Sequence, residues 1–131
     1  MSEGMSDALL SVRGLQAAYG SAQVLFDVSF DVREGEVVTL LGRNGMGRST
    51  TVKCLFGMLA AGGGAIRVSG RDVRGEPSHR IARRGLALVP EGRQVFSQLT
   101  VEENLVATAR GAGGNTAGRW TLDRVYALFP R

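Results

Sequence analysis

Apolar residues fall into alternating and continuous runs that predict strands in the first two thirds of the chain. Residues 9–15 mix apolar and polar positions in a strand-like way, and residues 26–32 alternate strictly, which is typical of a strand with one buried face. Residues 37–41 and 86–89 are unbroken apolar runs, which indicate strands covered on both faces. A further short strand is expected over residues 65–68. The pattern therefore predicts two buried strands and three others.

Helical patterns occupy the segments between and after these strands. One helix is expected after the glycine-rich loop at residues 42–50, a second over residues 77–84, a third over residues 101–109 and a fourth over residues 122–129. The second has proline in its first turn and glycine after its end. The third begins with a Thr-x-x-Glu sequence of the capping-box form, and the fourth carries apolar residues at helical spacing. Strands and helices together predict an α/β fold.

Length and composition describe one ordinary globular domain without a membrane span. The chain has 131 residues, of which 44% are hydrophobic and 21% charged. No apolar run approaches the ~20 residues that a membrane helix needs, and the acidic start is unlike a secretory signal. The single cysteine, Cys54, cannot form an internal disulfide and is expected to be a small core residue. A reducing cytosol is the expected compartment.

The basic charge of the chain does not by itself indicate nucleic-acid binding. The net charge is +4 and the pI about 10.2, which is compatible with such a partner. However, Lys53 is the single lysine beside fifteen arginines, a bias that points to coding preference rather than to a basic face. No nucleic-acid partner is expected.

The glycine-rich loop carries the most specific chemistry of the sequence. It matches the phosphate-binding pattern Gly-x-x-x-x-Gly-Lys-Ser at every fixed position but one. In such a loop, consecutive backbone N–H groups and the start of the following helix favour a polyphosphate, and Ser49 would offer its hydroxyl to Mg²⁺. A merely tight connection is the alternative, but the apolar run before the loop and the helix after it both favour a nucleotide. The residues expected to contact the nucleotide are Gly42, Arg43, Asn44, Gly45, Met46, Gly47, Arg48, Ser49 and Thr50.

The exception is Arg48, which stands where the motif has lysine. A lysine reaches the β- and γ-phosphates as a compact ammonium, whereas the arginine guanidinium is planar, forked and bulkier. One interpretation is drift under the arginine bias of the chain, and the other is a weakened nucleotide site. We expect impaired turnover with some nucleotide binding retained.

The surroundings of the loop resemble the ATP-binding subunit of ABC transporters, most closely the LivF-type subunit of branched-chain amino-acid importers. Tyr19 lies 23 residues before Gly42, where this family places an aromatic residue that stacks on adenine. Residues 24–32 look like the strand before the loop, and residues 88–96 and 99–105 resemble stretches typical of the branched-chain subgroup. The resemblance covers nearly the whole chain.

This resemblance implies a P-loop NTPase core of the ABC ATPase type joined to an antiparallel β region. The core and β region are expected over about residues 8–99, and the start of a helical region over about residues 100–131. The family's later Leu-Ser-Gly-Gly signature, Asp-Glu strand and switch histidine do not occur in this sequence. The chain therefore resembles the front portion of such a subunit, truncated before the signature motif. His79 is expected to be an ordinary exposed residue.

Three site roles are carried over from the family, each beside a plainer alternative. Tyr19 would stack on adenine, although alone it would be a packing or surface aromatic. Glu91 stands at the Q-loop position and is expected near Mg²⁺ and the attacking water, although a glutamate outside this family context would indicate no site. Residues 93–99 would face a membrane-embedded partner, or else form a solvated loop.

The implied function is the ATP-binding portion of the energising subunit of an ABC importer. ATP and Mg²⁺ are the expected cofactors. Transmembrane permease subunits and a second ATP-binding subunit, in a head-to-tail dimer, are the expected partners, at the inner face of the plasma membrane. The complete subunit would couple ATP hydrolysis to solute uptake, whereas this chain alone is expected to be inactive. The alternatives are a non-hydrolysing nucleotide-binding fragment and a nucleic-acid-associated ABC-type protein.

Overall fold

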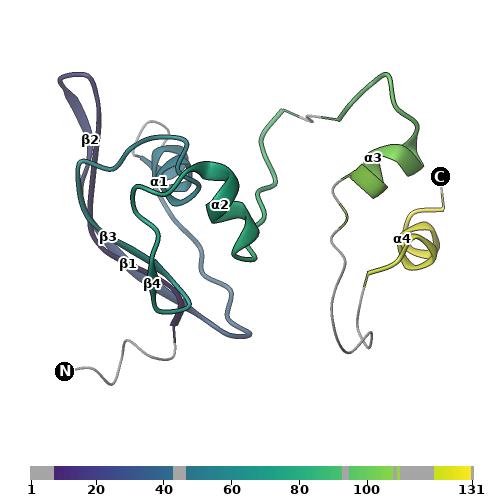
Figure 1. Ribbon diagram of the computed structural model, residues 1–131, viewed down its shortest axis with the longest axis horizontal. Coiled ribbons are helices and arrows are strands. Elements are labelled where there is room, and N and C mark those ends of the chain that lie inside the picture. The colour runs from purple at the N-terminus through teal and green to yellow at the C-terminus, as the bar shows by residue number, and fades with distance from the viewer. Residues whose placement is uncertain (1–7, 43–46, 93–94, 108, 110–119, 131) are drawn as a thin grey trace. The chain divides into compact units, whose positions relative to one another are not determined.

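The computed structural model describes residues 8–42, 47–92, 95–107, 109 and 120–130. They belong to two compact units, Met1–Leu88 and Val89–Arg131, and each unit is described by itself. In the described residues, the first unit contains a four-stranded antiparallel sheet and two helices, and the second contains two helices (Figure 1). The elements are β1 (Ala8–Tyr19), β2 (Ala22–Arg33), α1 (Arg48–Leu55), β3 (Gly63–Val68), β4 (Arg71–Asp72), α2 (Ser78–Arg83), α3 (Val101–Ala107) and α4 (Leu122–Leu128).

The sheet has the order β2-β1-β3-β4, so β1 pairs on both sides. The strands predicted over residues 9–15, 26–32 and 65–68 are confirmed as parts of β1, β2 and β3. Tyr19 pairs with Ala22, which leaves a two-residue hairpin loop whose first residue, Gly20, has a φ of 60°. A positive φ at that position is what a type II′ hairpin turn requires, and glycine adopts it without strain.

A bulge in β2 decides which of its side chains enter the core. Leu15 pairs with Val28, but Ala17 pairs with Leu25, so β2 has one residue more than β1 over this interval. Because side chains alternate between the faces of a strand, one extra residue moves the later ones to the other face. Leu25 is therefore buried, at 2% exposed, while Phe26 is 66% exposed. The alternation over residues 26–32 correctly predicts the strand, but Phe26 does not share its buried face.

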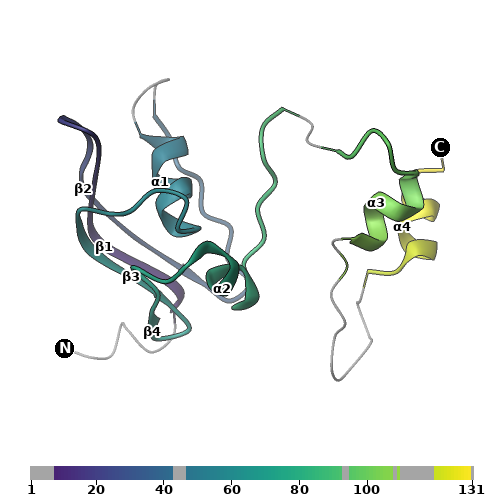
Figure 2. The same ribbon diagram turned by 45° about the horizontal axis from the view of Figure 1, so that its top comes forward.

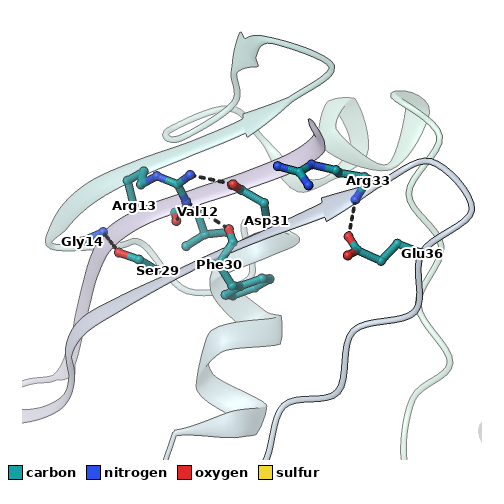
Figure 3. Close-up of polar contacts among 8 residues, drawn as sticks. All are labelled: Val12, Arg13, Gly14, Ser29, Phe30, Asp31, Arg33 and Glu36. Atoms are coloured by element: carbon teal, nitrogen blue, oxygen red, sulfur yellow. Dashed lines mark hydrogen bonds and ion pairs between the residues drawn. The ribbon is translucent and has the colours of Figure 1, made fainter. Parts of the chain in front are cut away.

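Polar contacts join β1 to β2 along the side of the pair that faces solvent (Figure 3). The Arg13 guanidinium donates to the Asp31 carboxylate, with 2.6 Å between Nη2 and Oδ2. The Gly14 N–H donates to Ser29 Oγ at 2.8 Å. At the end of β2, the Arg33 N–H donates to a carboxylate oxygen of Glu36, in the turn that follows the strand, at 2.8 Å. The hydrogen bond from Arg13 holds the pKa of Asp31 below its usual value.

The core of the first unit lies between the sheet and its helices. Figures 1 and 2 both show α1 and α2 on the same side of the sheet. Cys54 is buried, as expected, and its burial raises the pKa of the thiol. Of the apolar residues after the glycine loop, Leu55 is buried, and Phe56 and Leu59 pack against the core partly buried. The fully buried core side chains with the largest volumes are Leu15, Ile66, Ile81, Val12 and Val73.

The helix ends follow the local signals in the sequence. Pro77 is the N-cap of α2, and Gly85 follows its C-cap with a φ of 96°. At α3, the Glu103 N–H donates to Thr100 Oγ1 at 3.1 Å and the Thr100 N–H donates to a Glu103 carboxylate oxygen at 2.8 Å, which confirms the capping box. Thr121 caps α4 by accepting from the N–H of Arg124 at 3.2 Å. Among the described residues, no helix has the length and apolar character needed to cross a membrane.

The two strands predicted as buried on both faces are not formed. Residues 37–41 and 86–89 have no strand assignment, and Val37, Leu41 and Val89 are 92%, 87% and 93% exposed. A strand in the middle of a parallel sheet is stable only when neighbouring strands satisfy its backbone groups and helices cover both faces. In the part of the chain that the structure describes, no strand pairs with either run. The prediction of strands here is therefore wrong for this structure, and the sheet that forms is the antiparallel one.

Candidate nucleotide-binding site

The candidate site begins where the glycine-rich loop meets α1. Gly42 is exposed at the end of residues 37–42, and Gly47 is buried directly before the helix. Arg43, Asn44, Gly45 and Met46 lie outside the described residues, so their predicted contacts to phosphate stay predictions. The structure therefore describes the helical side of the loop.

Gly47 is the residue that seats the start of α1 on the sheet. Its φ is 90°, a conformation that L side chains rarely adopt. A Cβ atom at this position would lie 2.5 Å from Cδ2 of Leu25 in β2, so a side chain would also collide with the core. Backbone conformation and packing both require glycine, and together they hold the first turn of α1 against β2.

The first turn of α1 is suited to an anion. The turn contains no acidic residue, and the N-cap, Gly47, makes no side-chain capping bond. Arg48 and Ser49 are exposed, whereas Thr50 and Thr51 are buried at 7% and 3% exposed. The Thr51 N–H and hydroxyl both donate to the Gly47 carbonyl at 2.8 Å, and these two hydrogen bonds stabilise the first turn of the helix. The first turn thus carries two exposed residues, one with a guanidinium and one with a hydroxyl, at the N-terminus of the helix.

Tyr19 lies beside this helix. It ends β1, its side chain is 45% exposed, and Lys53 Nζ of α1 is 6.0 Å from the centroid of its ring. Ser49 and Lys53 are four residues apart in α1 and so share one face of the helix. This places the predicted adenine-stacking residue next to the helix that carries Arg48 and Ser49.

Lys53 is not among the residues that the glycine-loop motif predicts for the site. The signal was present, because Lys53 is the single lysine of the chain and follows Ser49 by one helical turn. What the sequence does not contain is the position of Tyr19, which depends on the β1–β2 hairpin and on its contact with α1.

The expected Mg²⁺ ligands fall into different units. Ser49 is exposed at the start of α1, and Glu91 is exposed in the second unit, so their pairing stays a prediction. In the described ranges, no group of three or more His, Cys, Asp and Glu residues could hold a metal ion. Mg²⁺ is commonly bound through one or two protein groups together with substrate phosphates and water, which fits a single hydroxyl at a phosphate loop. His79 is exposed on α2, as expected.

The chain matches a known protein family over most of its length. The profile of the ABC transporter family matches residues 25–129. The chain is 46% identical over 125 residues to the high-affinity branched-chain amino acid transport ATP-binding protein BraG of Pseudomonas aeruginosa, which covers 94% of this chain and 52% of BraG. It is 38% identical over 102 residues to LivG, a protein of the same description from Salmonella typhimurium, covering 78% of this chain and 40% of LivG. The chain thus spans about half or less of these two relatives.

Solved structures show the same likeness. A structure described as the ATP-binding subunit of an ABC transporter has a TM-score of 0.67 and 38% identity, covering 76% of this chain and 40% of that one. An ATP-binding cassette of an ABC transporter in its ADP conformation has a TM-score of 0.57 and 26% identity, covering 60% of this chain and 31% of that one.

Proposed function

The chain belongs to the ABC transporter family, and we propose that it is the ATP-binding portion of the energising subunit of a branched-chain amino-acid importer. The resemblance to ABC ATP-binding subunits and the α/β P-loop NTPase fold class are confirmed by the family match and the solved structures. BraG and LivG, both named for branched-chain amino acid transport, support the choice of solute.

The observation that carries the proposal is the start of α1 beside Tyr19. Backbone N–H groups from Gly45 to Ser49 would surround the β-phosphate, because donors at a helix N-terminus match phosphate charge. The adenine would stack on Tyr19, whose ring is half-exposed within reach of α1. Ser49 would hold Mg²⁺ through its hydroxyl, and Glu91 would lie near the metal and the water. When bound, Mg²⁺ neutralises phosphate charge.

Arg48 favours a second function, a subunit that binds nucleotide without turning it over efficiently. The guanidinium keeps the positive charge at the motif's lysine position, so attraction to the phosphates is retained. Its planar fork does not fit the space of a compact ammonium between the β- and γ-phosphates. In-line transfer depends on positioning, so hydrolysis suffers more than binding.

The partners follow from the same proposal. The chain would associate with transmembrane permease subunits at the inner face of the plasma membrane, through residues 93–99, and with a second ATP-binding subunit in a head-to-tail dimer. ATP hydrolysis coupled to uptake is proposed for the complete subunit. No nucleic-acid partner is proposed.

Titration with ATP and with inorganic tripolyphosphate tests the site. Tyr19→Ala removes the stacking surface and is expected to weaken ATP binding about tenfold, while leaving tripolyphosphate binding unchanged. Tyr126→Ala is the matched control, since the chain has two tyrosines and their side chains are 45% and 40% exposed. Arg48→Ala is expected to weaken both ligands. A Tyr19→Ala variant that binds ATP as the unchanged chain does would contradict the proposed placement of the base.

A further inference from the structure

We propose that an arginine patch on and beside α2 binds the anionic headgroups of a phospholipid surface. The patch consists of Arg71 of β4, Arg80 and Arg83 of α2, and Arg84, which follows this helix. Residues 67–84 contain six arginines and two acidic residues, an excess equal to the net charge of +4 of the whole chain. The positive excess of the chain is therefore concentrated in this one segment of the first unit, although the arginine bias by itself indicated coding preference rather than a basic face.

The patch is organised around a single carboxylate. Arg84 donates to both carboxylate oxygens of Glu76, at 2.9 Å from Nε and 2.7 Å from Nη2. This hydrogen bonding, with added attraction from Arg71 and Arg80, lowers the pKa of Glu76. Arg84 thus pairs with Glu76, while Arg71 and Arg80, both described and exposed, form no ion pair with it, so the segment keeps a positive excess. The other carboxylate of the segment, Asp72, accepts from the N–H of Arg74 at 2.9 Å.

The helix holds the patch on a fixed base. Ile81 of α2 is 2% exposed in the core, and a Cβ at Gly57 would lie 2.9 Å from its Cδ1, so α2 packs closely on the chain after α1. Arg80 and Arg83, on either side of Ile81 in sequence, are exposed. Their charges are therefore presented to solvent from a helix whose other face is anchored.

The chemistry of the patch favours lipid phosphate over single-stranded nucleic acid. Residues 57–88 contain no Phe, Tyr or Trp, so the aromatic platforms on which proteins stack unpaired bases are absent from this segment. Attraction between clustered arginines and anionic headgroups needs charge alone. The choice of a membrane rests on the proposed function, because the energising subunit of an importer works at the cytoplasmic leaflet.

Flotation of the full chain with vesicles tests the proposal, since bound protein rises with the lipid and aggregated protein does not. Vesicles of phosphatidylcholine with 30% phosphatidylglycerol are expected to carry the chain, vesicles of phosphatidylcholine alone are not, and high salt is expected to release it. The pair Arg80→Gln and Arg83→Gln is expected to weaken binding about 30-fold, at about fivefold per charge. Arg33→Gln, at the opposite edge of the sheet from Arg71, removes one charge elsewhere and is expected to have little effect.

Three results would overturn the proposal. They are equal flotation with neutral and anionic vesicles, equal weakening by Arg33→Gln and Arg83→Gln, and binding of a single-stranded oligonucleotide through Arg80 and Arg83 without any lipid binding. Circular dichroism of each variant checks that the fold is kept. ATP titration of the same samples reports on the proposed function separately, so loss of one activity does not imply loss of the other.

Discussion

Replacing Gly47 with alanine is the sharpest test of how the sheet positions the phosphate loop. The backbone at this position has a φ of 90°, and the added Cβ would lie 2.5 Å from Leu25 Cδ2. A left-handed conformation costs an L-residue about 1 kcal/mol or somewhat more, and overpacking a core costs about 1–3 kcal/mol. We therefore expect Gly47→Ala to destabilise the first unit by about 3 kcal/mol, which raises the population of opened molecules about 100-fold.

Gly35→Ala separates the two contributions. Gly35 has a φ of 73°, but a Cβ there meets nothing within 4 Å, so only the backbone strain remains. The expected cost is about 1 kcal/mol. Leu25→Val should lower the cost of Gly47→Ala by shortening the side chain that collides, which a double-mutant cycle measures as a coupling energy.

Cleavage by thermolysin under native conditions is a suitable assay, because its rate follows the population of opened molecules when closing is fast. ATP affinity, measured on the same variants, should fall for Gly47→Ala and stay unchanged for Gly35→Ala. If both alanine variants are cleaved at the same rate, Leu25 does not restrict Gly47 and the packing argument is wrong.

Three further predictions follow from the same residues. Arg48→Lys, made in a full-length subunit, should raise ATP hydrolysis by up to about 100-fold, because misplacement near 1 Å can cost that much; equal or lower turnover would show that the guanidinium is tolerated. Hydrogen bonds from Arg13 and Arg84 lower the pKa values of Asp31 and Glu76 from 3.8 and 4.5. The two ionised carboxylates therefore stabilise the fold fully above about pH 4.5, and this stabilisation is lost as the pH falls through the lowered pKa values. Urea unfolding at pH 6 and pH 3 should show this loss, and Asp31→Asn should reduce it. The chain alone should release no phosphate from ATP. It should also self-associate through exposed apolar residues such as Val37, Leu41 and Val89, which light scattering detects. A monomer with steady Mg²⁺-dependent turnover, abolished by Ser49→Ala, would contradict both expectations.

Local patterns predicted three strands of the sheet and the cap of α3, whereas the antiparallel β region was expected from the family resemblance. The determinants of the hairpin and of the α3 cap lie close together in sequence. The β1–β2 hairpin closes through Gly20 and its neighbour, and α3 is capped by residues three positions apart. The bulge that turns Leu25 inward and Phe26 outward was not visible, because it appears only when β1 and β2 are paired. A strict alternation establishes a strand but not which of its faces is buried.

The runs at residues 37–41 and 86–89 show the converse limit. Their composition is that of buried strands, yet an apolar run has no backbone partner of its own, and a strand exists only in a sheet. The described residues supply no neighbouring strand, and most of these side chains remain exposed, although Leu86 packs partly buried against the core. Composition therefore predicted that these residues require neighbouring strands and covered faces. The described part of the chain does not provide the neighbouring strands.

The candidate site divides in the same way between local and distant determinants. Glycine spacing correctly predicted a helix next to the loop, because the two are continuous in sequence, although α1 begins at Arg48, inside the range 42–50 expected to be loop. Tyr19 reaches that helix through the sheet, and its neighbour there, Lys53, adds a second cation one turn beyond Ser49. Under the proposed function, Arg48, Lys53 and the N-terminus of α1 would together attract a polyphosphate without the motif lysine, whereas hydrolysis would depend on the position that a compact ammonium fills. Retained nucleotide binding with impaired turnover therefore stays our proposal, and Arg48→Lys in a full-length subunit tests it.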